Sequence, residues 1–186
     1  MPSDRHAPIL LVRDCEATLI PSGTKIKLAK GDLVIVTQAL GDTITLTTNS
    51  GYLARITAND ADAIGLEVPA AEEEAPTQAV DAPFDIEQVM EKLKTVFDPE
   101  IPVNVVDLGL VYGCAAEPLA DGGQRVEIRM SMTAPGCGMG DVLAEEARAK
   151  VQALPGVAEV DVELVWDPPW DIHRMSDAAR LQLGML

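Results

Sequence analysis

A stretch rich in alanine, glutamate and proline divides this chain of 186 residues into two parts. Residues 69–83 include three consecutive glutamates at 72–74 and show no repeating aliphatic pattern. Like charges repel one another, and such a composition buries little apolar surface, so the stretch predicts an extended linker. The chain is therefore expected to form two folded parts, at residues 9–68 and 84–186, rather than one continuous core.

The first part is a series of short segments rich in β-branched residues. Gly, Asp, Asn and Pro separate these segments, as is typical of strands joined by tight turns. The expected strands are residues 18–20, 25–28, 33–38, 43–47 and 51–56. We predict that residues 9–68 form a small all-β barrel or roll.

The second part alternates between a helical and a strand periodicity. Helices are expected at residues 86–97, 141–154 and 176–183, and strands at residues 105–115, 125–132 and 157–166. The order α-β-β-α-β-α predicts a two-layer α/β domain, in which helices pack on a small mixed sheet. The predicted fold class of the whole chain is α+β.

One thiol lies between two glycines in Gly136-Cys137-Gly138, after the strand 125–132 and before the helix 141–154. The unpaired N–H groups and the positive dipole end of a helix N-terminus favour a thiolate. A thiolate binds soft metals and attacks electrophiles. The pattern predicts a metal ligand or a nucleophile, and the alternative is a small buried cysteine in a glycine-rich turn.

Carboxylates in two other segments are candidates for the same site. Asp107 lies inside the apolar strand expected at residues 105–115, and a buried acid needs a partner. It either accepts backbone hydrogen bonds, orients a hydroxyl such as that of Thr133, or binds a metal. Asp98 and Glu100 precede this strand; they either face the site or, in the case of Asp98, form a turn.

The segment Trp166-Asp167-Pro168-Pro169-Trp170 contains both tryptophans of the chain. Two consecutive prolines stiffen the backbone and leave two large apolar rings to be buried or presented. The segment is either a rigid turn that packs on the core or an interaction surface made by Trp166, Pro168, Pro169 and Trp170.

The composition argues against several classes of partner. The net charge is −16, which disfavours binding to nucleic acid and to anionic membranes. No apolar run approaches the roughly 18 residues of a membrane span. The three scattered cysteines predict reduced thiols and a cytoplasmic protein rather than a disulfide framework.

Residues 84–186 resemble the MIP-type domain of iron–sulfur cluster assembly factors. The resemblance rests on four motifs in this order: Asp98-Pro99-Glu100-Ile101-Pro102, Asp107-Leu108-Gly109-Leu110-Val111, Thr133-Ala134-Pro135-Gly136-Cys137 and Trp166-Asp167-Pro168-Pro169-Trp170. The first part is similar to the N-terminal extension of SufT proteins, accessory factors of the SUF system, through Arg13-Asp14-Cys15-Glu16 and Asp60-Ala61-Asp62-Ala63-Ile64-Gly65.

The resemblance implies a non-enzymatic factor that delivers an iron–sulfur cluster or iron, held transiently, to apo-proteins. It implies Cys137 as the key thiol, with Asp107 and Thr133 lining its site, SUF proteins and apo-proteins as partners, and a homodimer. From their positions in the sequence, Gly136, Gly138, Asp98 and Glu100 are further candidates to line this site. A cluster usually takes four cysteine ligands, whereas the site offers one. A second subunit, Cys15, Asp107, a small thiol or the client could provide the others.

Two other functions fit the same residues. One is a metal-free adaptor between the assembly machinery and its clients. The other is a thiol-dependent enzyme, the weaker hypothesis, since the chain has only His6 and His173 as candidate imidazole bases.

Overall fold

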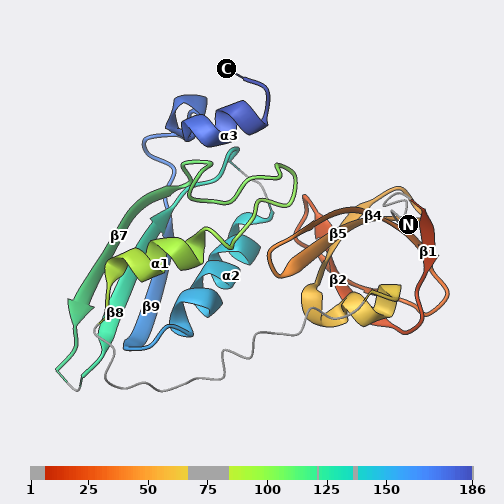
Figure 1. The fold of residues 1–186 in the computed structure, drawn as a ribbon, viewed down its shortest axis with the longest axis horizontal. Coiled ribbons are helices and arrows are strands. Elements are labelled where there is room, and N and C mark those ends of the chain that lie inside the picture. Colours follow the sequence, from red (N-terminus) through yellow and green to blue (C-terminus); the bar gives the residue numbers. More distant parts are fainter. Residues whose placement is uncertain (1–6, 67–83, 121, 136–137, 186) are drawn as a thin grey trace. The chain divides into compact units, whose positions relative to one another are not determined.

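The computed structural model describes residues 7–66, 84–120, 122–135 and 138–185 (Figure 1). The chain divides into two compact units, Met1–Ala75 and Pro76–Leu186. The predicted linker, residues 69–83, lies entirely outside the described residues. None of the helices in the described ranges is both long and apolar enough to cross a membrane.

The first unit is an antiparallel sheet followed by one short helix. Its strands and helix are β1 (Pro8–Leu10), β2 (Cys15–Ile20), β3 (Lys25–Leu28), β4 (Leu33–Leu40), β5 (Thr43–Thr48), β6 (Leu53–Thr57) and the 3-10 helix η1 (Ala58–Ile64). The strand order is β1-β4-β5-β6-β2-β3. Strands lie where the sequence predicts them, with β1 as an addition.

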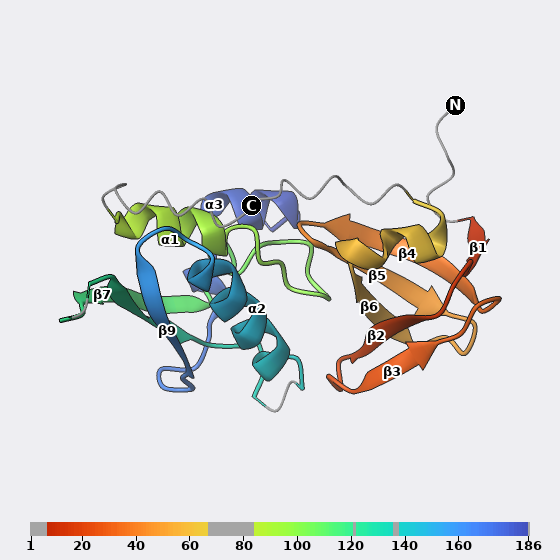
Figure 2. The same ribbon diagram turned by 90° about the horizontal axis from the view of Figure 1, so that it is seen from below.

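The sheet of the first unit curls around its core but does not close (Figure 1 and Figure 2). The strands β1 and β3 form its two edges, and β3 pairs with β2 alone. The prediction of a barrel is therefore wrong, because a closed barrel needs hydrogen bonds between its first and last strands. The curled sheet still encloses an aliphatic core that includes Val34, Leu46 and Ile56.

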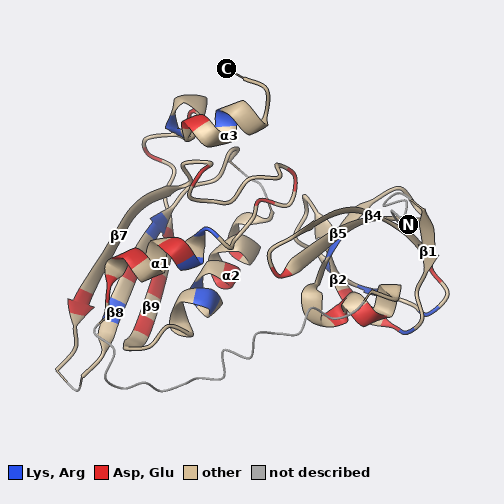
Figure 3. Ribbon diagram, in the orientation of Figure 1, with Lys and Arg blue, Asp and Glu red and all other residues tan. Residues whose placement is uncertain are grey.

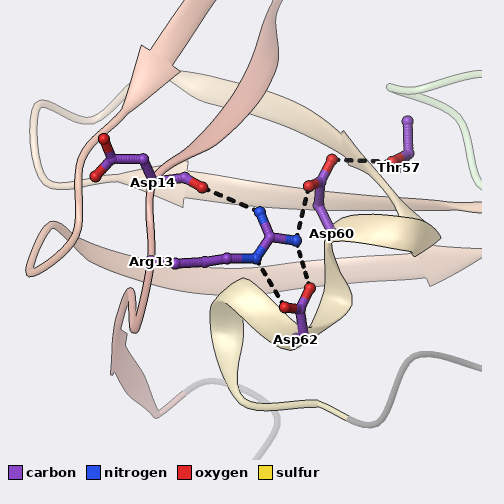
Figure 4. A network of polar contacts seen from close by, with 5 residues as sticks. All are labelled: Arg13, Asp14, Thr57, Asp60 and Asp62. Carbon is purple, nitrogen blue, oxygen red and sulfur yellow. Dashed lines mark hydrogen bonds and ion pairs between the residues drawn. The ribbon is translucent and has the colours of Figure 1, made fainter.

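A network around Arg13 joins the connection between β1 and β2 to η1 (Figure 4). The Arg13 Nε donates to Asp62 Oδ2 at 2.7 Å, and its Nη2 donates to Asp60 Oδ1 at 3.0 Å. Its Nη1 donates to the carbonyl oxygen of Asp14 at 3.0 Å, and Asp60 also accepts a hydrogen bond from Thr57 Oγ1. Two N-terminal motifs that lie far apart in the sequence thus form one structural clamp.

The second unit contains one mixed sheet and three α-helices. Its elements are α1 (Ile86–Leu93), β7 (Val111–Pro118), β8 (Gln124–Met130), α2 (Gly140–Gln152), β9 (Val157–Leu164), the 3-10 helix η2 (Ile172–Arg174) and α3 (Asp177–Gln182). The order of α-helices and strands is the predicted one, and the α+β class is confirmed.

The sheet of the second unit has the order β7-β8-β9, with an antiparallel pair β7/β8 and a parallel pair β8/β9. The helices α1 and α2 lie on one face of it (Figure 1). On this face Val126, Ile128 and Met130 of β8 pack with Leu143 and Ala147 of α2. The mixed sheet is thus as predicted.

Two predicted boundaries are wrong. The first helix ends at Leu93 rather than at residue 97, and Phe97 instead forms an isolated bridge with Asn104. The strand expected from residue 105 begins only at Val111. Residues 105–110 form turns, because Gly109 has a positive φ and because Asn104 bonds the backbone that follows it.

We predict that Arg13→Met lowers the thermal unfolding midpoint of the first unit, since it keeps the apolar stem but removes the guanidinium group. The hydrogen bonds from Arg13 lower the pKa of Asp62. Their stabilisation is present at neutral pH and is lost as the pH falls through that lowered pKa. Circular dichroism melts at pH 7 and pH 3 measure both effects. Lys25→Met, at an exposed cation of β3, is the control, and equal melting of the two variants at pH 7 would contradict the clamp.

Candidate functional site

The segment that contains the predicted thiol joins the parallel strands β8 and β9 through α2. Met130 ends β8, Gly140 begins α2, and residues 131–139 connect them. A parallel pair needs such a crossover, and the loop before the helix comes to lie at the carboxyl ends of the strands. In sheets with parallel strands, ligands bind at this end.

Within the described part of the chain, no side chain caps the N-terminus of α2. Met139 occupies the N-cap position in a right-handed helical conformation, and its side chain accepts no capping hydrogen bond. A Cβ at Gly140 would lie 3.2 Å from Leu164 Cδ1 and 3.4 Å from Met132 Cγ. Gly140 therefore lets the helix start close to the ends of β8 and β9, with its positive dipole end uncovered by a capping side chain.

Cys137 and Gly136 lie outside the described residues, so the geometry of the site is built from their neighbours. Pro135 and Gly138, on either side of this pair, are both exposed, and Thr133 is partly buried. In the sequence, Cys137 therefore lies two residues after the exposed Pro135 and directly before the exposed Gly138.

The turn that contains Asp107 lies beside the end of β8. The N–H of Ser131 donates to the carbonyl oxygen of Leu110 at 2.7 Å, which joins the turn to the loop that leads to α2. The Asn104 Nδ2 donates to Asp107 Oδ2 at 2.6 Å, and Asn104 Oδ1 accepts from the N–H of Asp107 at 2.9 Å. Asp107 is partly buried in a turn rather than buried in a strand, and no hydrogen bond joins it to Thr133 within the described part of the chain.

The C-terminal segment after β9 holds this turn in place. The indole Nε1 of Trp170 donates to the carbonyl oxygen of Leu108 at 2.8 Å, and the N–H of Ser176 donates to that of Asp107 at 2.8 Å. Arg174 donates from Nε to the carbonyl oxygen of Gly109 at 3.2 Å. These bonds satisfy three successive carbonyl groups, so the two motifs act as one structural element.

The segment with both tryptophans therefore has two roles. Trp170 is partly buried and packs against the core, as expected of a rigid turn. Trp166 is 43% exposed, and Pro168 and Pro169 are exposed as well. Of the predicted interaction residues, Trp166, Pro168 and Pro169 are available to a partner, whereas Trp170 is held by its hydrogen bond to Leu108.

The acids of the first motif behave differently from each other. The Oδ1 of Asp98 accepts hydrogen bonds from the N–H groups of Glu100 at 2.8 Å and Ile101 at 2.9 Å. Asp98 is buried and shapes a turn, while the side chain of Glu100 is exposed. Only Glu100 of this pair is placed to meet a ligand from solvent.

The two thiols within the described residues are poor ligands. Cys15 is 5% exposed in the core of the first unit, and burial, together with the charge of Asp60, raises its pKa. Cys114 lies on the core face of β7, and burial raises its pKa too. Among the described residues no three His, Cys, Asp or Glu side chains form a group able to hold a metal ion.

Sequence reasoning missed three residues of this end of the sheet. Asn104 could have been found from the turn preference of an asparagine within a run of valines. Nothing in the sequence marks Ser131, which is 1% exposed and whose Oγ has no hydrogen-bond partner among the described residues. Arg174, whose Cζ lies 3.7 Å from the centroid of the Tyr112 ring, is likewise identified only by its contacts.

Comparison with known proteins places the second unit in a described group. The sequence matches the iron–sulfur cluster assembly protein family over residues 86–162, which run from α1 into β9. It is 44% identical over 100 residues to the Fe-S protein maturation auxiliary factor of Porphyromonas gingivalis, covering 54% of this chain and 91% of that protein.

Two further relatives carry similar names. The Fe-S protein maturation auxiliary factor YitW of Bacillus subtilis is 36% identical over 99 residues, covering 53% of this chain and 93% of that protein. The Fe-S protein maturation auxiliary factor SufT of Staphylococcus aureus is 33% identical over 90 residues, covering 48% of this chain and 98% of that protein. The family match begins at residue 86, so the similarity of the first unit to SufT extensions stays a prediction.

We predict that Gly109→Ala destabilises the second unit by at least about 2 kcal/mol, as judged from the cost of a left-handed conformation and of overpacking. Gly109 has φ 71°, and a Cβ there would overlap the backbone of Arg174. Urea unfolding measures the change. Gly113→Ala is the control, because a Cβ at Gly113 meets nothing within 4 Å, and a similar loss in both variants would contradict the proposed close packing.

We also predict a strong difference in thiol reactivity at pH 7.5. Cys15 and Cys114 should react slowly with iodoacetamide, because burial hinders access and their raised pKa values lower the thiolate fraction. Cys137, which lies between the exposed Pro135 and Gly138 in the sequence, should react first. Mass spectrometry of peptides over a time course checks the order, and early labelling of Cys15 would show that its burial is wrong.

Proposed function

The chain belongs to the family of iron–sulfur cluster assembly proteins, and we propose that it is an accessory factor that carries or targets iron–sulfur clusters to apo-proteins. Cys137 is the thiol that holds the cluster, or iron, for a short time. Its relatives are named as maturation auxiliary factors, which supports an accessory role.

The observation that carries this proposal is the uncapped N-terminus of α2 at the carboxyl end of the β8/β9 pair. The thiol of Cys137 precedes this end by a short, glycine-flanked stretch of chain. Free N–H groups and the helix dipole favour a thiolate over a thiol, and they also favour an anionic cargo. Exposed neighbours at Pro135 and Gly138 leave room for a second macromolecule to approach.

Incomplete ligation supports transient carriage rather than permanent binding. A cluster is usually held by four cysteines, and the burial of Cys15 and Cys114 makes them poor candidates. The missing ligands would then come from another molecule, such as a second copy of this chain or the client. In this arrangement Asp107, Thr133 and Glu100 line the site, and transfer is complete when client thiolates have replaced Cys137 as well as the outside ligands.

We also propose the partners of this protein, its oligomeric state, its location and its lack of catalytic activity. Its partners are SUF assembly proteins and apo iron–sulfur proteins, it works as a homodimer in the cytoplasm, and it catalyses no reaction. The name of the Staphylococcus aureus relative supports the link to SufT-type factors. The side chain of His173 is exposed, and its Nε2 lies 3.9 Å from Asp171 Oδ1. The described residues therefore offer no buried imidazole that could act as the base of an enzyme.

An adaptor that binds no metal is the second candidate. It is favoured by the exposed indole of Trp166 beside the exposed prolines 168 and 169, because large exposed apolar groups often mark interaction sites. In this case Trp166 rather than Trp170 would contact the partner, since Trp170 supports the fold.

We expect anaerobic reconstitution with iron and sulfide to give the wild-type protein visible charge-transfer absorption and bound iron. Cys137→Ser should lose both, because an alcohol is a poor ligand for a cluster. Cys114→Ala is the matched control and should keep them. Equal iron and sulfide contents in wild type and Cys137→Ser would rule out the ligand role, and no cluster in any of the three would leave the adaptor as the better function.

A further inference from the structure

The strand β9 forms an edge of the second sheet, and its outer side pairs with no other strand in the described residues. The N–H of Val165 donates to the carbonyl oxygen of Met130 in β8 at 2.7 Å. Backbone groups of a strand point alternately to its two sides, so those of Val160 and Val162 face outward. The Gln152 Nε2 covers one outward carbonyl, that of Ala158, at 3.0 Å.

The edges β3 and β7 carry features that discourage pairing with any strand, whereas the acids of β9 discourage only an acidic one. Natural edge strands are protected by lysines, prolines and bulges. Strand β3 has the exposed Lys25 and Lys27, and β7 has a register shift after Val111 and ends at Pro118. Strand β9 contains no lysine, arginine or proline, and its register with β8 is regular from Glu159 onward. Its outer side is an open template for another strand.

A groove lies beside the first half of this edge. It has a volume of about 320 Å³ and is lined by Arg148 and Gln152 of α2, by Arg125 of β8, and by residues 158–161 of β9. The charge of Arg148 is offset by Glu145, whose Oε2 lies 3.9 Å from the Arg148 Nε. When an extended segment adds to a sheet, main-chain hydrogen bonds supply affinity, and pockets for alternate side chains supply specificity.

The charges of β9 select the chemistry of that segment. Glu159, Asp161 and Glu163 are exposed at every second position on the face of the sheet that α1 and α2 leave open. The neighbouring strand β8 provides bases on the same face of the sheet. Arg125 Nη2 lies 3.7 Å from Asp161 Oδ2, and Arg129 Nε lies 3.6 Å from Glu163 Oε2. Figure 3 shows these bases on β8 beside the acids of β9. Opposite the three acids of β9, strand β8 places Arg125 beside Glu159, Glu127 beside Asp161 and Arg129 beside Glu163, so two of the three acids have a basic neighbour.

A second copy of β9 is a poor occupant of this edge. Pairing two such strands would set acids opposite acids, and like charges directly opposite each other destabilise a strand pair. Nucleic acid is repelled for the same reason. A basic extended segment avoids both problems.

We propose that β9 accepts an extended basic segment of a partner protein as a fourth strand. Lys or Arg at every second position would face Glu159, Asp161 and Glu163, and small apolar residues would alternate with them beside α2. Trp166 follows the end of β9 and is exposed, so it lies near one end of the bound segment. This inference goes beyond the proposed function and does not require Cys137 to bind metal.

The test uses the full chain and a fluorescein-labelled synthetic peptide in which lysine and valine alternate. Fluorescence anisotropy at near-physiological salt measures the binding of the peptide to the protein. We expect saturable binding. A peptide of the same sequence with N-methyl groups on alternate residues keeps its charge but cannot complete the strand hydrogen bonds, so its affinity should fall at least about tenfold. Equal binding of both peptides, or no binding of the first, would overturn the proposal.

Protein variants locate the binding edge. Asp161→Lys should weaken binding of the unmethylated peptide about tenfold, because attraction becomes repulsion on the paired strand. Glu117→Lys makes the same charge change on β7 and should alter the affinity less than about twofold. Circular dichroism checks that both variants fold. If Asp161→Lys does not fold, Asp161→Asn replaces it in the binding measurement. Equal losses from the two positions would mean general attraction to an acidic surface and would contradict strand addition.

Discussion

The parallel pairing of β8 with β9 is the constraint on which the rest of the second unit depends. Two adjacent parallel strands cannot be joined by a tight turn, so the chain must cross one face of the sheet, and α2 makes this crossing. The burial of Ile128 and Met130 against Leu143 stabilises the arrangement, because each removes a large aliphatic side chain from water. As a consequence the N-terminus of α2 and the loop before it come to lie at the carboxyl ends of both strands, and β9 is left at an edge.

The C-terminal segment complements this arrangement by fixing the turn beside the same end of the sheet. Trp170 and Arg174 bind the carbonyl oxygens of Leu108 and Gly109, and the absence of a side chain at Gly109 lets the backbone of residue 174 approach closely. Buried carbonyl groups without partners would cost free energy, so these bonds stabilise a turn that lacks regular ladder partners. The same segment presents Trp166 to solvent, which combines a structural and an exposed role within five residues of chain.

The first unit uses its distinctive residues for structure. Arg13 binds Asp60 and Asp62, Asp14 pairs with Lys27 at 2.8 Å, and Cys15 is buried in the core. These contacts give the residues of the two N-terminal motifs structural roles. The family match lies in the second unit, over residues 86–162.

Local patterns were enough to predict most helices and strands of both parts and their order in the second part. They also place Cys137 in the stretch between a strand and a helix, because periodicity and glycine spacing depend only on residues close together in the sequence. They failed where distant segments decide the outcome. Closure of the first sheet depends on pairing between β1 and β3, which does not occur, and the expected strand at residue 105 yields to the turn held by Asn104 and Trp170. The sequence by itself determined the order of helices and strands in the second part, and it makes Cys137 the candidate thiol. Only the tertiary structure decided which motifs meet, which tryptophan is exposed and which strand edge is open. Hydrogen bonds between residues more than sixty positions apart, such as Trp170 to Leu108, leave no periodic trace in the sequence.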